Sequence, residues 1–486
     1  MLPTIIQGGM GVGVSNWRLA AAVSRLGQLG VVSGTALDQI LVRRLQDGDP
    51  GAHVRRSLAR FPVPAIAARI RDAYFIPGGK TPQQSYATLP LPGAVRDRAF
   101  EELCIVGNFV EVDLAREGHA NPVGINYLEK VQIPHLPSLY GAMLAGVSVV
   151  LMGAGIPLKI PGALDRLARH EPAAYPLYVT DAAPGGDAML TFVPADFTGG
   201  ALPPLTRPAF FAIISSDVLA RTLQKKSNGR VDGFIVEGPT AGGHSAPPRG
   251  KAQLSGRGEP VYGERDRVDL QKMRDLGLPF WLAGGFGTPE RLRQAIAAGA
   301  AGVQVGSAFA LCAESGLRDD YRRALLKRVI ERDVSIFNDP AASPTGFPFK
   351  IAQLPGTLSE PAVYAARPRI CDLGYLREAY RTADGAIGFR CPAEPVSLYV
   401  SKGGREADTA GRKCICNALI ANVGHAQVRA RTHVEPGVVT LGEDLDAIHR
   451  FLPPGASDYA AADVVAVLMH APAGSSPGAT ASKVSA

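Results

Sequence analysis

A single histidine directly follows two glycines at the end of a short apolar stretch. It is His244, in the segment Val236-Glu237-Gly238-Pro239-Thr240-Ala241-Gly242-Gly243-His244. Because imidazole titrates near neutral pH, it can accept or donate a proton during a reaction. A loop histidine taken alone is more often an ordinary surface residue, so a catalytic role for His244 depends on the residues around it.

Two later segments each place a glycine-containing turn after an apolar stretch. Ala283-Gly284-Gly285-Phe286-Gly287 leads into a helix that should begin with Thr288 as its N-cap and Pro289 in its first turn, and Val305-Gly306-Ser307 follows it. Successive strand-to-helix turns with free backbone N–H groups can hold a phosphate. We interpret this pair as a phosphate-binding site rather than as two ordinary loops.

The chain opens with a third glycine-rich segment, Gln7-Gly8-Gly9-Met10-Gly11-Val12-Gly13. Adjacent glycines allow a flat ligand to lie against the main chain, because no Cβ atom intervenes. The acidic residue of a dinucleotide-binding βαβ unit does not follow, so a Rossmann site has weak support. Considered by itself, the segment is equally well a tight turn.

The elements that must position these segments follow a repeated pattern of an Ala-rich helix, a glycine and a short β-branched strand. The expected strands are residues 4–7, 31–33, 122–127, 147–152, 210–214, 233–236, 280–283 and 302–305. Continuous apolar strands separated by helices indicate a parallel sheet covered by helices. The glycine-rich segments and His244 would then lie at the carboxyl ends of strands, where ligands bind. The pattern favours a (β/α)8 barrel, with an open doubly wound sheet as the alternative.

Two regions depart from this alternation. We expect residues 61–120 to form a helical and loop insertion within a barrel domain of residues 1–350. Residues 351–470 should form a C-terminal extension that either covers the barrel mouth or makes a subunit interface, the latter giving a homodimer. Residues 471–486 are rich in Ala, Ser, Gly, Pro and Thr, have nothing to bury and are expected to be a disordered tail.

Composition excludes several classes of protein. Of the 486 residues, 46% are hydrophobic and 20% are charged, which supplies a large core and rules out general disorder, a disulfide scaffold or a fibre. The net charge of +7 is spread among interleaved acids, so we expect no nucleic-acid partner. Residues 138–158 are uncharged, but their glycines and Pro157 indicate a buried helix running into a strand. With no secretion signal, we expect a cytoplasmic protein without a membrane partner.

Other reactive side chains have weaker patterns. Four of the six cysteines lie in the C-terminal region, at Cys371, Cys391, Cys414 and Cys416. No Cys-x-x-Cys pair is present, so we expect reduced thiols and no metal site, with a zinc site as the alternative. The cations Lys80, Lys130 and Arg249 could face an anionic substrate, but we expect each to be solvated.

Four segments, taken in order, resemble the nitronate monooxygenases. This family was formerly called 2-nitropropane dioxygenase, and FMN-dependent enoyl reductases are its relatives. The matching segments are residues 5–11, 241–244, 283–286 and 302–309, within a resemblance that covers roughly residues 1–330. It implies a TIM barrel that binds FMN non-covalently and acts as a flavoprotein monooxygenase.

The resemblance also implies roles for individual residues. His244 matches the family's catalytic histidine. The FMN phosphate would be held by Gly284, Gly285, Gly306 and Ser307. The remaining expected cofactor contacts are Gly9 and Met10 beside the isoalloxazine, Asn126, Glu237, Gly242 and Gly243.

The chain departs from the family pattern next to His244. The family commonly has Q-G-x-E-A-G-G-H-x-G, whereas here Glu237 stands at the Gln position and Thr240 at the Glu position. A carboxylate near the flavin would disfavour negative charge on the reduced ring.

Three functions follow as hypotheses. The first is oxidation of an alkyl nitronate or nitroalkane by dioxygen to a carbonyl compound and nitrite. The second is an FMN-dependent, nicotinamide-linked enoyl (acyl carrier) reductase. The third is a non-redox barrel that binds another phosphorylated ligand.

Overall fold

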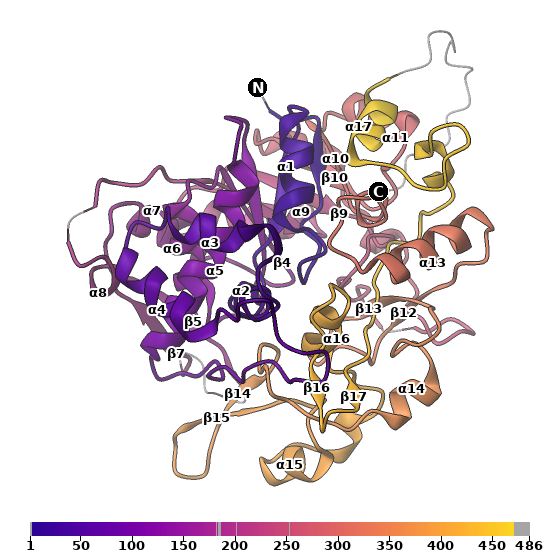
Figure 1. Ribbon diagram of the computed structural model, residues 1–486. Helices are drawn as coiled ribbons and strands as arrows, with labels where there is room; N and C mark the ends of the chain where they lie inside the picture. Colours follow the sequence, from indigo (N-terminus) through magenta and orange to yellow (C-terminus); the bar gives the residue numbers. More distant parts are fainter. Residues whose placement is uncertain (1, 181, 183–185, 201, 252, 471–486) are drawn as a thin grey trace, which may run out of the picture.

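Eight parallel strands form the centre of the molecule (Figure 1). The structure is a computed structural model that describes residues 2–180, 182, 186–200, 202–251 and 253–470. The strands are β1 (Ile5–Gln7), β2 (Gly30–Ser33), β3 (Val123–Leu128), β4 (Val149–Gly153), β8 (Ala209–Ile214), β9 (Gly233–Glu237), β10 (Phe280–Ala283) and β11 (Gly302–Val305). They pair in the order β1-β11-β10-β9-β8-β4-β3-β2, and a parallel bridge from Ile6 to Leu29 closes the ring. The predicted (β/α)8 barrel is therefore confirmed, and the open-sheet alternative is wrong.

Each barrel strand is apolar on both faces because it separates two cores. Side chains such as Ile6, Val31 and Leu151 pack inside the ring, whereas their neighbours in sequence pack outward against the helices. Trp281 fills part of the interior, stacks on Phe211 with ring centroids 4.8 Å apart and donates from Nε1 to the Pro3 carbonyl at 2.8 Å. This double burial explains why the strands are continuous apolar runs in the sequence.

A ring of helices covers the strands. Its members are α1 (Trp17–Arg25), α5 (Arg98–Arg116), α6 (His135–Leu144), α7 (Ile160–Ala168), α9 (Asp217–Lys226), α10 (Leu270–Asp275), α11 (Pro289–Ala297) and α17 (Ala461–Met469). As predicted, the uncharged segment 138–158 is a buried helix, α6, running into β4. Among the described residues, no helix is both long and apolar enough to cross a membrane.

The last helix of the ring comes from the end of the described chain. Helix α17 packs against both α1 and α11, which is where the helix after β11 would lie (Figure 1). More than a hundred residues therefore leave the barrel after β11 before the chain returns to complete it. The expected tail, residues 471–486, lies outside the described residues.

Residues 61–120 contain α4 (Pro64–Tyr74), a loop and α5. Helix α5 packs against α1 and α6, so it belongs to the ring. The segments that precede it, α2 (Leu37–Gln46), α3 (His53–Leu58) and α4, make up the excursion between β2 and β3. The domain boundaries proposed from the sequence stay a prediction.

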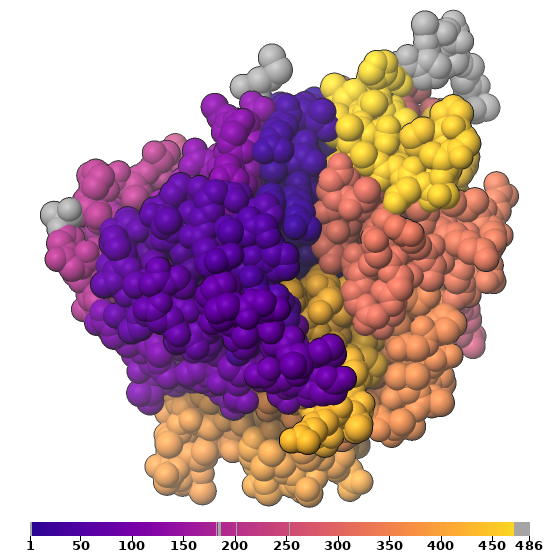
Figure 2. Space-filling view, viewed as in Figure 1, coloured from indigo at the N-terminus to yellow at the C-terminus, as the bar shows by residue number. Residues whose placement is uncertain are grey.

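Residues 319–460, called the C-terminal region from here on, form small hairpins and short helices that pack beside and below the barrel in Figure 1. Figure 2 shows the same region in orange and yellow. Strands β12 (Ile336–Asp339) and β13 (Phe349–Ala352) pair antiparallel, and β14 (Glu378–Arg381) pairs with β15 (Ile387–Arg390) and with β6 (Val179–Thr180). Its helices include α13 (Asp319–Ile330), α14 (Pro361–Ala366), α15 (Val396–Ser401) and α16 (Ile415–Ala421). The C-terminal region also contains a hairpin of β16 (Val428–Arg429) and β17 (His433–Val434). A separate hairpin of β5 (Ala173–Leu177) and β7 (Ala188–Phe192) lies in the segment that connects β4 to β8.

Buried polar contacts fix this region to the barrel. The Tyr375 hydroxyl donates a short hydrogen bond to Asp38 of α2, and burial raises the pKa of Asp38 to about 6. The buried Arg43 of α2 donates from Nη1 to the carbonyl of His425 at 2.6 Å. The C-terminal region is thus packed onto the barrel rather than appended to it.

Candidate active site

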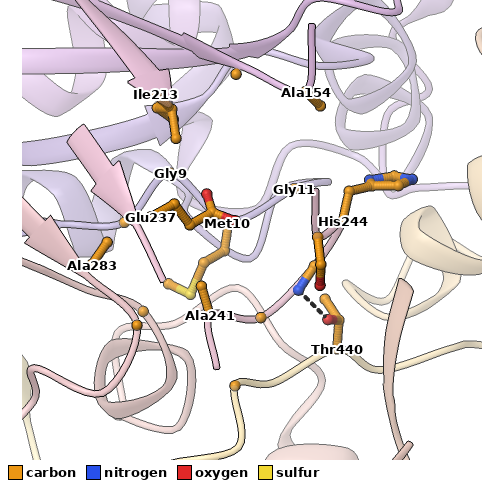
Figure 3. Close-up of a pocket in the computed structure, with 18 of the residues that line it drawn as sticks. Gly9, Met10, Gly11, Ala154, Ile213, Glu237, Ala241, His244, Ala283 and Thr440 are labelled. Atoms are coloured by element: carbon orange, nitrogen blue, oxygen red, sulfur yellow. Dashed lines mark hydrogen bonds between the residues drawn. The ribbon is translucent and has the colours of Figure 1, made fainter. Parts of the chain in front are cut away.

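A cavity of about 500 Å³ lies at the carboxyl ends of the barrel strands (Figure 3). Residues at the ends of all eight strands line it, as expected for a barrel of this kind. Every residue predicted for the site lies on its wall, namely Gly9, Met10, Asn126, Glu237, Gly242, Gly243, His244, Gly284, Gly285, Gly306 and Ser307. The C-terminal region completes the wall with residues that include Cys416, Leu419 and 440–442.

The two predicted phosphate turns follow β10 and β11, the seventh and eighth strands of the barrel in chain order. Gly284 and Gly285 both have positive φ, +81° and +78°, which favours glycine at each position. Helix α11 then begins with Thr288 as N-cap, whose side chain accepts a hydrogen bond from the Arg291 N–H at 3.2 Å. This confirms the predicted helix start.

Free donors remain at these turns. The backbone N–H groups of Gly285 and Ser307 donate to no acceptor within the described part of the chain. The Ser307 hydroxyl accepts a hydrogen bond from the N–H of Gly442 at 2.8 Å, so a C-terminal loop packs onto the second turn. Free N–H groups on glycine turns beside a cavity are typical of a site for a phosphate.

Two buried amide oxygens also lack partners. Asn126 donates from Nδ2 to the Gly9 carbonyl at 3.1 Å, while its Oδ1 has no hydrogen-bond partner among the residues that the structure describes. Gln304 of β11 lines the same cavity, and its Oε1 is likewise buried and unpartnered. At Gly9 a Cβ atom would stand 2.2 Å from the Cβ of Asn126, so this close approach requires glycine. Because buried polar atoms are normally paired, the two oxygens indicate acceptors left for a ligand.

His244 lies half-buried on the cavity wall, and its ring contacts Phe349 with centroids 4.8 Å apart. Its Nε2 atom is 2.7 Å from the hydroxyl of Ser343, which in turn is 2.9 Å from the hydroxyl of Thr345. Burial lowers the pKa of His244 to about 4, so the ring is neutral at pH 7. With Nε2 bonded to Ser343, the Nδ1 atom has no partner among the described residues.

The turn that carries His244 is held by residues far away in sequence. The Gly243 N–H donates to the Thr440 hydroxyl at 2.7 Å, the bond drawn in Figure 3, and the Gly243 carbonyl accepts from the Lys350 N–H at 3.0 Å. The Ser245 N–H donates to the Pro348 carbonyl at 2.9 Å. The C-terminal region therefore sets the position of His244.

A buried cation and a cavity-facing acid lie next to this turn. The side chain of Lys350 is fully buried, and its ammonium donates to the Pro239 carbonyl and lies 3.1 Å from Glu443. Glu237, at the end of β9, has no hydrogen bond from the described residues to its carboxylate. Burial raises the pKa of Glu237 to about 7, and the Lys350 ammonium acts against this rise.

Of the three cations considered in the sequence, Arg249 is the one that reaches the cavity. Arg249 lines the cavity, but its guanidinium donates to the carbonyls of Ser215 and Arg265. Lys80 lies over the Tyr86 ring and bonds a nearby carbonyl, and Lys130 lies over the ring of Phe347. Neither lysine lines the cavity.

All six cysteines are free thiols. Cys416 lines the cavity, whereas Cys371, Cys391 and Cys414 do not. Among the described residues, no group of three or more His, Cys, Asp or Glu side chains is arranged to hold a metal ion.

Four residues of this site were missed in the sequence, namely Gln304, Ser343, Lys350 and Thr440. Gln304 and Lys350 had a detectable signal, because each is a polar residue within an otherwise apolar strand. Ser343 and Thr440 had none, since they act through contacts with residues about 100 and 200 positions away.

Known proteins resemble parts of this chain. The model of the nitronate monooxygenase family matches residues 209–336. A nitronate monooxygenase from Pseudomonas aeruginosa is 38% identical over 94 residues, which is 19% of this chain and 25% of that protein. The chain thus matches about a quarter of the length of this curated relative.

Solved structures resemble the chain more distantly. FabK from Thermotoga maritima aligns with a TM-score of 0.47 and 16% identity over 96% of this chain and 91% of its own. A nitroalkane oxidase from Streptomyces ansochromogenes aligns with a TM-score of 0.46 and 16% identity over 96% and 94%. The barrel assignment rests on the strand pairing itself.

The family match lies on the half of the barrel that carries the predicted chemistry. Residues 209–336 run from β8 to β12 and include the His244 turn and both glycine turns after β10 and β11. Through this segment, the chain is similar to the nitronate monooxygenase family.

Proposed function

We propose that this protein is an FMN-dependent oxidoreductase that oxidises a nitronate or its parent nitroalkane with dioxygen, giving a carbonyl compound and nitrite. One observation carries the proposal. The family-matched segment brings His244 and the two glycine turns to a single cavity at the carboxyl ends of the barrel strands. In barrels this position combines a phosphate site after the seventh and eighth strands with reactive groups on the other strand ends.

The residues of the cavity fit FMN. Gly284, Gly285, Gly306 and Ser307 would hold the phosphate, because their turns leave backbone N–H groups without acceptors in the described part of the chain. The unpartnered oxygens of Asn126 and Gln304 would accept hydrogen bonds from the ring system. When bound there, FMN supplies the two-electron redox centre that the amino acids lack.

His244 is the residue we propose to handle the substrate proton. Its ring is neutral at pH 7, and its Nε2 atom is bonded to Ser343, which leaves Nδ1 for the substrate. A neutral imidazole can accept the proton on the carbon next to the nitro group. In the part of the chain that the structure describes, three acids, Glu237, Asp266 and Asp444, line the cavity against one cation, Arg249. This charge pattern favours a neutral nitroalkane over an anionic nitronate.

The same charge pattern supports a second candidate. A cavity lined by apolar side chains, in which the acids Glu237, Asp266 and Asp444 outnumber the single cation Arg249 among the described residues, also suits a neutral enoyl ester. The protein would then be a nicotinamide-linked enoyl reductase, with His244 acting on a proton of the substrate. The two candidates share the cofactor site and differ in the electron donor.

An anaerobic absorbance titration of the FMN-loaded protein tests both candidates. We expect nitroethane or ethyl nitronate to reduce the flavin absorbance without any nicotinamide. Reduction by NADH or NADPH alone, with no response to either nitro compound, would favour the enoyl reductase. Failure of the purified protein to bind FMN would contradict both and leave a barrel for another phosphorylated ligand.

A further inference from the structure

A second cavity, of about 360 Å³, lies within the C-terminal region. Its lining includes Ala365, Arg367, Arg369, Arg412, Lys413 and Cys414. Four of these side chains are cations, and none is an acid. The cavity is therefore lined very differently from the active-site cavity, where acids are present.

Two of the four cations are neutralised by acids outside the lining. Arg367 forms a short ion pair with Glu435, and Lys413 lies 3.1 Å from Asp339. Both pairs are largely buried, so little solvent screening is available. The other two cations of the lining are Arg369 and Arg412.

Arg369 and Arg412 contact neutral oxygens instead of carboxylates. Arg369 donates to the Thr409 carbonyl at 2.6 Å and to the Tyr364 hydroxyl at 3.3 Å. Arg412 donates to the Ala341 carbonyl at 2.9 Å and to the Asp408 carbonyl at 3.0 Å. Within the described part of the chain, neither forms an ion pair. The Asp408 carboxylate interacts with Arg412 electrostatically, but it forms its ion pair with Arg405.

Donor groups also remain free. Arg412 uses Nε and Nη1 in its carbonyl contacts, while its Nη2 has no acceptor among the described residues. Arg367 is 8% exposed, and its Nη1 likewise has no acceptor there. Placing excess positive charge in a partly buried pocket is unfavourable unless an anion compensates it. The planar donor set of a guanidinium suits the oxygens of a phosphate.

We propose that this cavity binds the phosphate group of a small ligand, either inorganic phosphate or a phosphate monoester. This inference does not depend on the proposed function. The site is separate from the glycine turns, because the two cavities share no lining residue among those described. They are close together, since Cys414 lines one cavity and Ile415 and Cys416 line the other. Arg412 also donates to the carbonyl of Ser343, the residue bonded to His244. A bound phosphate would therefore lie next to the support of the active site.

Isothermal titration of the FMN-loaded protein tests the proposal. Inorganic phosphate and glycerol 3-phosphate are titrated separately at constant ionic strength, with chloride as the reference anion. Loading with FMN keeps the glycine turns occupied. We expect binding of at least one of the two ligands at one site per chain, and at least a tenfold loss of affinity in Arg412→Gln.

Two further variants keep the result clear if Arg412→Gln fails to fold. Ala365 is exposed at the cavity wall, so Ala365→Trp should fill the cavity without removing a charge and should also abolish binding. Arg274→Gln is the matched control, because Arg274 is an exposed arginine that donates to the Ala298 carbonyl elsewhere on the surface. It should leave binding unchanged.

The outcomes separate the sources of the phosphate. Binding of inorganic phosphate alone assigns a free-anion site, and binding of glycerol 3-phosphate alone assigns an ester site. Binding of neither ligand, or binding that survives both cavity variants, overturns the proposal. If the protein binds no FMN, the same titration is made on the purified chain. Loss of phosphate binding in Ser307→Ala but not in Ala365→Trp would then place the phosphate on the glycine turns and overturn the proposal.

Discussion

The two parts of the candidate active site are built in different ways. The turn after β10 is fixed locally by glycines with positive φ and by the Thr288 cap of the following helix. The His244 turn is instead held by Thr440, Lys350 and Ser343, which come from the C-terminal region. The proposed cofactor site thus belongs mainly to the barrel, whereas the proposed substrate site depends on residues beyond the family-matched segment.

The turn after β10 is held by residues that are close together in sequence. The placement of His244 is set from outside the barrel core, so changes in the C-terminal region can alter substrate handling without removing the cofactor. Variants on the two sides should therefore have separable effects on turnover and on FMN affinity.

The largest effect is expected for His244→Asn. Removing the proposed proton acceptor should lower turnover at least about 100-fold, while FMN content stays near that of the unaltered protein. Steady-state kinetics and the flavin absorbance of the purified variant measure the two quantities. His449→Asn, an exposed histidine bonded to the Asp446 carbonyl, is the control and should change neither. Normal turnover in His244→Asn would make the histidine a structural residue.

A smaller effect is expected for Ser343→Ala, which removes the partner of His244 Nε2. We expect about tenfold lower turnover and a shifted pH profile, because the ring loses the bond that fixes its orientation. Ser343→Thr keeps the hydroxyl and should restore the pH profile. An unshifted pH profile in Ser343→Ala would show that the contact does not position the ring.

Lys350→Met should mainly reduce stability. The variant loses the hydrogen bonds to the Pro239 carbonyl and Ser245, while Glu443 can turn to solvent because its side chain is 45% exposed. We expect a loss of about 1–3 kcal/mol in the free energy of unfolding, measured by urea denaturation. Turnover should fall several-fold with FMN affinity unchanged. A stability equal to that of the unaltered protein would contradict the structural role of Lys350.

The smallest effect concerns Glu237, whose pKa is about 7 in the folded protein against 4.5 for an ordinary glutamate. Between these values the folded state binds more protons than the unfolded state, so this contribution to stability is lost as pH rises. Glu237→Gln should therefore gain about 1–3 °C in Tm over the unaltered FMN-free protein between pH 5 and pH 8. His244, with a pKa of about 4, acts in the opposite direction in both proteins and cancels in the difference. A Tm difference independent of pH would contradict the burial of this carboxyl.

Much of the barrel was predictable because its signals are local. All eight strands were expected from apolar runs, and the start of α11 from Thr288 and Pro289. The glycine turns were recognised because each follows such a strand directly. The predicted site residues all lie in one cavity because the parallel strands end on the same side of the barrel.

The rest could not be predicted because it depends on contacts between distant segments. The short strands of the C-terminal hairpins carry no alternation long enough to detect, and β6 pairs with β14 across about 200 residues. The place of α17 in the ring of helices could not be predicted from local sequence either. This helix packs against α1 and α11 but comes from the far end of the described chain. Ser343 and Thr440 acquire their importance only from where this packing places them.

An FMN fluorescence titration of Gly284→Ala tests directly whether the glycine turns hold the cofactor phosphate. A Cβ atom at Gly284 would lie 3.0 Å from the Gly238 carbonyl oxygen and 3.0 Å from the Ala241 nitrogen, at a φ of +81°. Gly277→Ala is the matched control, with a φ of +70° and open space around it before the same strand. We predict at least tenfold weaker FMN binding for Gly284→Ala and unchanged binding for Gly277→Ala. Equal FMN affinity in both variants would contradict a cofactor phosphate on the glycine turns.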